Sequence, residues 1–194
     1  MPASEWITFL KAWLRSPTRV GGIAPSSVAL ARQMVEGLHP EPREAVIEFG
    51  PGTGPFTRAI EEVLPDPKSY LGIERDLRFV GLLKERFPRL RFMHGSAEQA
   101  PRFLEEAGLG RIRAVICGLP FASLPAATQD GVINGLNGIL GPGSEFRTFQ
   151  YVHAYPLPAA VRYRRRMREI FGPHKISRPV LWNLPPAFVL AWRR

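Results

Sequence analysis

The sequence has little cysteine and little histidine. One cysteine among 194 residues excludes an internal disulfide framework and a cysteine-based zinc site. The four histidines are far apart in the chain and do not have the spacing of metal ligands on one helix; they are His39, His94, His153 and His174. We therefore expect no bound metal.

Long apolar runs are also absent. The two most apolar stretches, around residues 114–127 and 180–192, are broken by Pro120, Pro125, Pro185 and Pro186, so we predict no transmembrane helix. The first residues include Glu5 and no basic start, which argues against a secretory signal. These absences favour the cytoplasm.

Charge, by contrast, is unevenly distributed. Lys and Arg number 26 and Asp and Glu 17, giving a formal net charge of +9. Residues 41–113 hold twelve of each sign, whereas residues 114–194 hold ten basic and three acidic residues. A basic surface indicates an anionic partner, either nucleic acid or an acidic membrane. The excess lies toward the ends of the chain.

Short apolar segments alternate with helical patterns through most of the chain. We predict strands over residues 45–50, 69–74, 90–95, 113–118 and 145–152, and helices over 26–37, 54–64, 77–87, 98–107, 126–139 and 159–171. This rhythm is typical of an α/β, Rossmann-like fold with a mostly parallel sheet. Residues 176–183 and 185–192 predict a C-terminal antiparallel strand pair. The length suggests one domain overall.

Residues 4–15 predict an N-terminal amphipathic helix. Its apolar arc includes Trp6, Phe9 and Trp13, while Lys11 and Arg15 lie opposite or beside it. Such a helix either packs on the protein core or lies at a membrane interface. We expect residues 1–40 to form a cover over the cofactor and substrate, and residues 41–194 to form the main domain.

A glycine-rich loop follows the first predicted strand. Glu48 and Phe49 precede Gly50, Gly52 and Gly54, and Glu74 closes the second strand 24 residues after Gly50. Glycines allow a tight turn and a close approach to a ligand, and a carboxylate at the end of the second strand can accept both hydroxyls of a ribose. The pattern predicts a nucleotide-type cofactor.

The Glu-x-Gly-x-Gly-x-Gly loop resembles that of class I S-adenosylmethionine-dependent methyltransferases. The resemblance implies that S-adenosylmethionine is the cofactor and S-adenosylhomocysteine the product. It places Glu48 near the methionine amino group and Glu74 at the ribose. The full set of cofactor-binding residues that it implies is Ser26, Ser27, Glu48, Phe49, Gly50, Gly52, Gly54, Glu74, Arg75, Gly95, Ser96, Ala97, Gly118, Leu119 and Pro120.

The loop after the fourth predicted strand reads Gly118-Leu119-Pro120-Phe121. Adenine-N6 methyltransferases of nucleic acids carry Asn or Asp at the first of these positions, where the side chain accepts a hydrogen bond from the target amine. Gly118 has no such acceptor, which argues against methylation of a flipped adenine. The preceding Cys117 is interpreted as a buried small residue and not as a nucleophile.

Three segments together resemble a narrower family, the bacterial phospholipid N-methyltransferases. They are residues 13–27, 118–121 and 183–188. The resemblance implies methylation of phosphatidylethanolamine and its methylated forms toward phosphatidylcholine. Ornithine-lipid N-methyltransferases and rRNA or tRNA adenine N-methyltransferases remain the alternatives. The resemblance to phospholipid N-methyltransferases also implies a phospholipid substrate and no nucleic-acid partner. It further implies a monomer that binds peripherally to the anionic inner face of the plasma membrane.

Residues beyond the fifth predicted strand are the candidates for chemistry. A headgroup amine must be neutral to attack, so we predict His153 as the base and Tyr151 as a contact to the amine. Phe121 and Tyr151 offer aromatic faces for the methylated cation. The predicted contacts to substrate or membrane are Trp6, Phe9, Trp13, Arg15, Phe121, Tyr155, Arg162, Arg165 and Arg166. The basic helix over 159–171 alternatively presents a solvated face on a packed helix.

Overall fold

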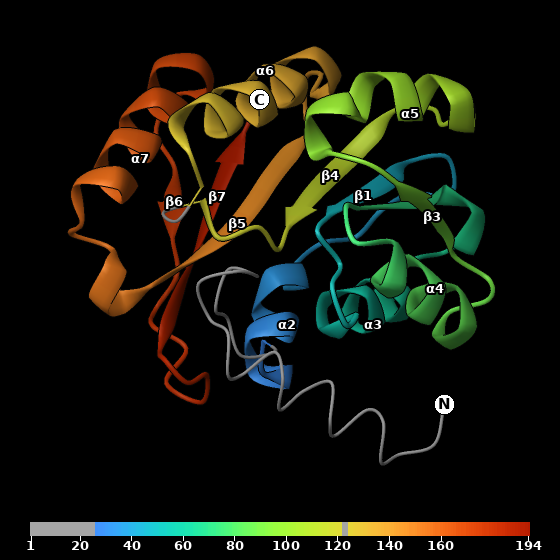
Figure 1. The fold of residues 1–194 in the computed structure, drawn as a ribbon, viewed down its shortest axis with the longest axis horizontal. Helices are drawn as coiled ribbons and strands as arrows, with labels where there is room; N and C mark the ends of the chain where they lie inside the picture. The colour runs from blue at the N-terminus through green and yellow to red at the C-terminus, as the bar shows by residue number, and fades with distance from the viewer. Residues whose placement is uncertain (1–25, 122–123) are drawn as a thin grey trace.

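The computed structural model describes residues 26–121 and 124–194 (Figure 1). Its seven strands form one sheet in the order β3-β2-β1-β4-β5-β7-β6. The strands are β1 (Ala45–Phe49), β2 (Tyr70–Glu74), β3 (Arg91–His94), β4 (Ile112–Cys117), β5 (Glu145–Tyr151), β6 (Lys175–Ile176) and β7 (Ala187–Arg193). The first five are mutually parallel, and β7 is antiparallel to both neighbours. The predicted Rossmann-like fold is confirmed.

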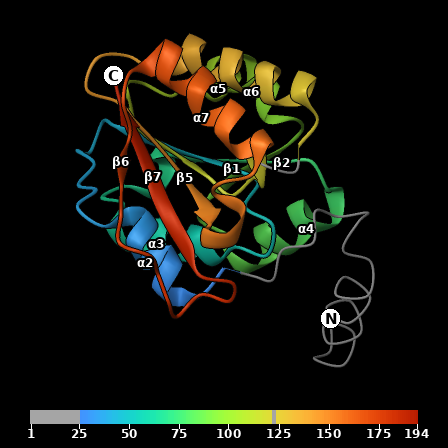
Figure 2. The same ribbon diagram turned by 90° about the vertical axis from the view of Figure 1, so that its left-hand side faces the viewer.

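Helices cover both faces of the sheet. They are α2 (Val28–Val35), α3 (Pro55–Val63), α4 (Leu77–Arg86), α5 (Ala100–Ala107), α6 (Ala126–Ile139) and α7 (Pro158–Phe171). Helices α2, α3 and α4 lie on one face, and α5, α6 and α7 on the other (Figures 1 and 2). Each face has its own apolar core, so every residue of β1 and β2 is buried. That burial explains their continuous apolar sequences.

The C-terminal strands differ from the prediction. Residues 176–183 do not form a full strand: β6 spans only Lys175–Ile176, and one isolated bridge joins Val180 to Ala187. Pro179 interrupts this run, because proline has no N–H for a ladder bond. The long partner of β7 is instead β5, which pairs with it from Tyr151↔Ala187 to Glu145↔Arg193.

Parallel strands bring the carboxyl ends of β1, β4 and β5 to one edge of the sheet, which we call the carboxyl edge. Because β7 runs the other way, its first residue, Ala187, lies beside Tyr151 at that same edge. In open α/β sheets, ligands bind at this edge. The connection from β6 to β7 therefore lies near the loops expected to bind the cofactor.

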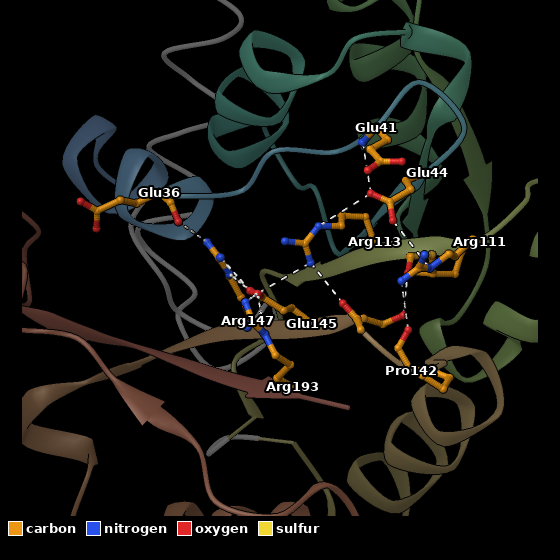
Figure 3. Close-up of polar contacts among 12 residues, drawn as sticks. Glu36, Glu41, Glu44, Arg111, Arg113, Pro142, Glu145, Arg147 and Arg193 are labelled. Carbon is orange, nitrogen blue, oxygen red and sulfur yellow. Dashed lines mark hydrogen bonds and ion pairs between the residues drawn. The ribbon is translucent and has the colours of Figure 1, made fainter.

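A buried ionic cluster fixes α2 against the sheet (Figure 3). Arg147 of β5 donates to the carbonyl oxygens of Met34 and Glu36 at 3.2 and 2.7 Å, and to the carboxylate of Glu145. Burial alone raises the pKa of Glu145, but hydrogen bonds from Arg193 and Arg147 outweigh it and hold that pKa below its ordinary value. The cluster holds the last turn of α2 on β5.

The amphipathic helix predicted over residues 4–15, with Trp6, Phe9, Trp13 and Arg15, lies outside the described residues. Within residues 26–121 and 124–194, no helix is both long and apolar enough to cross a membrane. The same residues contain no group of three His, Cys, Asp or Glu placed to hold a metal ion.

Candidate functional site

The glycine-rich loop turns sharply between β1 and α3. Gly50, Gly52 and Gly54 have φ values of 66°, 58° and 86°, in the left-handed region that favours glycine. The N–H of Gly50 donates to the carbonyl oxygen of Ile73 at 2.9 Å, which holds the loop against the end of β2. A Cβ at Gly54 would lie 2.6 Å from the Phe87 ring, so this glycine also permits close helix packing.

Glu74 connects three of the predicted cofactor segments. Its carboxylate accepts hydrogen bonds from the N–H groups of Gly52 and Asp76, both at 2.9 Å, and its carbonyl oxygen accepts from the N–H of Gly95, also at 2.9 Å. Each carboxylate oxygen keeps a second lone pair for a ligand hydroxyl. The side chain is thus held in place by backbone donors before a ribose arrives.

Glu48 is completely buried at the end of β1. One carboxylate oxygen accepts from the Thr57 hydroxyl at 2.7 Å and from the Tyr70 hydroxyl, while Oε1 has no hydrogen-bond partner in the part of the chain that the structure describes. Burial raises the pKa of Glu48 to about 7, and the bonds from Tyr70 and Thr57 only partly offset it. Sequence reasoning did not identify Thr57 or Tyr70, because tertiary packing alone brings them to Glu48.

The loop after β4 lies directly against the glycine-rich loop. The N–H of Gly118 donates to the carbonyl oxygen of Phe49 at 2.8 Å. A Cβ at Gly118 would lie 2.7 Å from the carbonyl oxygen of Gly50, and a Cβ at Gly50 would lie 2.6 Å from the Leu119 side chain. A side chain at position 118 would therefore force the two loops apart. Pro120 follows and is half-buried.

The segment after β3 completes this group of loops. Ser96 caps the short helix η2 (Ala97–Gln99), in a capping box with Gln99. The Ser96 hydroxyl also donates to the Glu98 carboxylate at 3.3 Å, so it is already bonded within its own turn. Arg75 is exposed, and its carbonyl oxygen lies 3.1 Å from Nε2 of His94.

Comparison with known proteins identifies this arrangement. The family model for ribosomal RNA adenine dimethylase matches residues 26–100. An ornithine lipid N-methyltransferase of Singulisphaera acidiphila is 32% identical over 190 residues, covering 94% of this chain and 93% of the relative. The chain belongs to the class I S-adenosylmethionine-dependent methyltransferases.

Other relatives agree at the level of fold. A ribosomal RNA small subunit methyltransferase A of Prosthecochloris aestuarii is 35% identical, but over only 57 residues, which are 29% of this chain and 21% of that protein. A TehB-like methyltransferase structure from Corynebacterium glutamicum has a TM-score of 0.62 at 11% identity and covers 99% of each chain. SMU.1697c of Streptococcus mutans, solved with S-adenosylhomocysteine, has a TM-score of 0.61 at 14% identity, covering 89% of this chain and all of that one.

The described loops fit S-adenosylmethionine, the cofactor of this methyltransferase. A Cβ at Gly52 would meet nothing within 4 Å, so the loop presents bare backbone to open space. Glu48 supplies a buried oxygen without a partner, and Glu74 supplies an oriented carboxylate. The contacts of Glu48 with the methionine amine and of Glu74 with the ribose stay predictions.

Tyr151 and His153 come together where β5 ends. Their rings stack with centroids 5.6 Å apart and planes 10° apart. Tyr151 is half-buried, and this burial raises its pKa to about 12; His153 is exposed in the short helix η4 (Val152–Ala154). The geometry thus places the two predicted catalytic residues side by side.

The start of α2 is tied to the C-terminal hairpin. The Ser27 hydroxyl caps the helix by accepting from the N–H of Leu30 at 3.1 Å, and the Ser27 N–H donates to Oδ1 of Asn183 at 2.9 Å. Asn183 is buried and also donates to the carbonyl oxygen of Pro185. Ser26 and Ser27 therefore lie at the carboxyl edge, where Asn183, a residue that sequence reasoning did not identify, holds Ser27 in place.

The role predicted for Phe121 is wrong. Its side chain is 2% exposed and stacks on Tyr163 with centroids 4.3 Å apart, inside the core under α7. Tyr155 lies on the same side of the sheet, and one face of its ring is covered by the Arg164 guanidinium at 3.6 Å. The direction in which an aromatic side chain points depends on the residues that pack around it. The spacing of residues in the sequence does not contain that information.

Helix α7 packs on the sheet by its apolar side, because Tyr163, Met167 and Phe171 are buried. Its basic side is exposed, as the solvated-face interpretation requires: Arg165 pairs with Glu169, Arg166 pairs with Glu169 and Asp130, and Arg162 is exposed. Cys117 is buried, as its interpretation as a buried small residue expects, and this burial raises the pKa of its thiol to about 12.

Proposed function

We propose that this methyltransferase acts on the amine of a membrane-lipid headgroup, and that an ornithine lipid is its preferred substrate. The observation that carries this proposal is the extent of the similarity. The ornithine lipid enzyme matches 94% of the chain, so the match extends beyond the loop at 118–121. The similarity to ribosomal RNA dimethylase spans residues 26–100, before the loop after β4.

Gly118 supports the same proposal independently. An Asn or Asp acceptor for an adenine amine has no room at this position, because the carbonyl oxygen of Gly50 would lie 2.7 Å from its Cβ. A primary alkyl amine does not need that acceptor once it has lost its proton. The loop geometry therefore favours an aliphatic amine over a base.

The chain must remove a proton from that amine. The pKa of Tyr151 is raised to about 12, so its phenol stays protonated at neutral pH and serves as a hydrogen-bonding contact, not as a base. His153 stacks on Tyr151 and is exposed, so an imidazole that accepts the proton can release it to solvent. When bound, S-adenosylmethionine supplies the methyl group on a positively charged sulfur.

Phosphatidylethanolamine is the second candidate substrate, supported by the resemblance of residues 118–121 and 183–188 to phospholipid N-methyltransferases. The predicted setting is the same for both lipids: a monomer bound peripherally to the anionic inner face of the plasma membrane, without nucleic acid. The arginines of α7, including Arg162, Arg165 and Arg166, are exposed and suit anionic phosphates.

The test uses labelled S-adenosylmethionine with four substrates in parallel: vesicles containing ornithine lipid, vesicles containing phosphatidylethanolamine, ribosomal RNA and tRNA. We expect label in lipid, with the ornithine lipid preferred. His153→Gln should lower kcat, because the variant lacks the imidazole that accepts the proton of the headgroup amine, and His39→Gln, on the exposed linker before β1, should not. Label in RNA alone would contradict the proposal.

A further inference from the structure

The loop between β6 and β7 exposes an unusual set of side chains. Trp182 is 87% exposed, Leu184 is 79% exposed and Leu181 is 67% exposed. Large apolar side chains exposed together within four residues mark an interaction site. We call residues 181–184 the LWNL loop.

The loop is held in a defined shape. Asn183, its one polar residue, is buried and bonds to Ser27 and Pro185, while its N–H donates to the carbonyl oxygen of Val180 at 3.3 Å. The bridge between Val180 and Ala187 closes the base of the loop. The polar residue thus points inward and the three apolar residues outward, the reverse of the usual arrangement.

The LWNL loop does not stand alone. It connects to β7 at the carboxyl edge, and the N–H of Val152 donates to the carbonyl oxygen of Pro186 at 2.9 Å, which joins the loop to η4. Val28, the residue after Ser27, is 68% exposed, and Val152 and Leu157 are also exposed. Figures 1 and 2 show the hairpin beside the start of α2. Apolar side chains from three segments therefore gather at the edge that carries the site.

Charge indicates the kind of partner. Residues 170–194 contain no Asp or Glu, and Lys175 and Arg178 are exposed just before the loop. Exposed tryptophan and leucine side chains near basic residues complement a bilayer with anionic headgroups. The apolar side chains enter the boundary of the acyl chains, and the cationic side chains bind the lipid phosphates. Binding to a protein partner would not require that residues 170–194 lack Asp and Glu, so the absence of acidic residues favours an anionic bilayer as the partner.

From these contacts we infer that the LWNL loop inserts into an anionic lipid bilayer and brings the carboxyl edge, with Tyr151 and His153, against the headgroups. This inference rests on the proposed lipid substrate. The inference goes beyond that substrate because it assigns membrane docking to the C-terminal hairpin, whose residues are not among the predicted membrane contacts.

The first experiment measures binding of the full chain to vesicles of phosphatidylcholine mixed with phosphatidylglycerol. Trp182→Ser combined with Leu184→Ser should lower the partition coefficient between vesicles and water about tenfold or more. Ile176→Ser is the matched control, because Ile176 is a half-exposed apolar residue on the same hairpin but away from the loop. Circular dichroism should show all three chains folded, since the substituted side chains are exposed.

The second experiment places a probe on the loop. Cys117 is the single cysteine of the chain and is buried, so a cysteine introduced by Leu184→Cys can be labelled selectively with an environment-sensitive dye. The emission should shift to the blue when anionic vesicles are added, and a dye attached after Ile176→Cys should not shift.

Unchanged vesicle binding by the double variant, or no spectral shift at position 184, would overturn the inference. Binding that is unchanged together with a lower melting temperature would show instead that another segment of the chain covers the loop. Activity of the wild-type chain on detergent-dispersed lipid separates the two proposals: if no amine lipid is methylated there, the proposed function fails, whereas the vesicle results still decide the docking loop.

Discussion

At the scale of single residues, Glu48 makes the stability of the protein depend on pH. Its pKa is raised from 4.5 to about 7 in the folded chain. Below pH 4.5 the carboxyl is protonated in both folded and unfolded states. Between 4.5 and 7 the unfolded state loses its proton first, so stability falls as pH rises, and above 7 the full cost of up to about 3 kcal/mol is present.

Urea unfolding at several pH values tests this dependence. We expect Glu48→Gln to be more stable than the wild type at pH 8 and to lose the advantage at pH 4. The amide can still accept from Thr57 and Tyr70 through its oxygen. Parallel stability curves for the two chains across this range would show that folding does not raise the pKa of Glu48.

Glu74 provides a prediction for cofactor affinity. Glu74→Ala removes the acceptor for the N–H groups of Gly52 and Asp76 and the carboxylate for the ribose. Two hydrogen bonds to a charged group correspond to a loss of S-adenosylmethionine affinity of about a hundredfold. Calorimetry measures it directly. Glu85→Ala, an exposed carboxylate on α4, should bind as the wild type does.

Gly118 gives a steric prediction. Gly118→Ala places a methyl group 2.7 Å from the carbonyl oxygen of Gly50, so the cofactor loop must move, and affinity should fall about tenfold or more. Gly81→Ala is the control: a Cβ there meets nothing within 4 Å inside α4, and alanine should add about 0.5–1 kcal/mol of stability. Equal affinities for the two variants would mean that the close contact has no role in binding.

The sequence predicted the residues whose role depends on chain spacing. Gly50 and Gly52 follow β1 and Glu74 is the last residue of β2, and the parallel pairing of these strands brings the three residues to one edge. It did not predict Tyr70 or Asn183, because their partners are 22 and 156 residues away in the chain. Local patterns carry no information about such contacts.

At the scale of helices and strands, the predicted elements are largely confirmed. Strands β1, β2 and β4 and helices α3, α4 and α6 lie within one or two residues of the predicted bounds, because apolar periodicity is a local property. The predicted helix over 98–107 divides into η2 and α5, since Ser96 caps a first short turn and Pro101 lies in the first turn of α5. The pairing of β7 with β5 depends on long-range packing.

Arg147 connects two of these elements, and its removal should loosen α2. Arg147→Ala leaves the carbonyl oxygens of Met34 and Glu36 without this donor and weakens the pairing of buried Glu145. We expect a loss of about 2–4 kcal/mol in urea unfolding and faster hydrogen exchange in α2. Arg89→Ala, which breaks an exposed ion pair with Glu61, should change stability by less than about 1 kcal/mol.

The pH dependence of that loss follows from Glu145. Because its pKa is lowered in the folded chain, the ionised form contributes stability above the ordinary value of 4.5, and that contribution is lost as pH falls through the folded pKa. The difference between wild type and Arg147→Ala should therefore shrink in acid. A difference that stays constant down to pH 2 would contradict this role for the ion pair.

At the scale of the whole molecule, the uneven charge predicts how salt affects membrane binding. Raising the salt concentration from about 0.1 to 1 M shortens the screening length from roughly 10 to 3 Å and should weaken vesicle binding of the wild-type chain. The binding that remains should come from the LWNL loop, and Trp182→Ser combined with Leu184→Ser should remove it. Vesicle sedimentation at both salt concentrations measures the two contributions. Salt-independent binding would exclude a role for the basic residues.

Strand β7 has a practical consequence because it runs away from the carboxyl edge. It begins beside Tyr151 and ends at Arg193, and Arg194 is bonded to Gly143 and Ser144 at the opposite edge. Seven extended residues span roughly 23 Å. A fluorescent protein or surface tether attached after Arg194 would therefore leave the LWNL loop and the cofactor site facing outward. Position 194 is thus suitable for attaching a label for imaging or a tether for immobilising the enzyme.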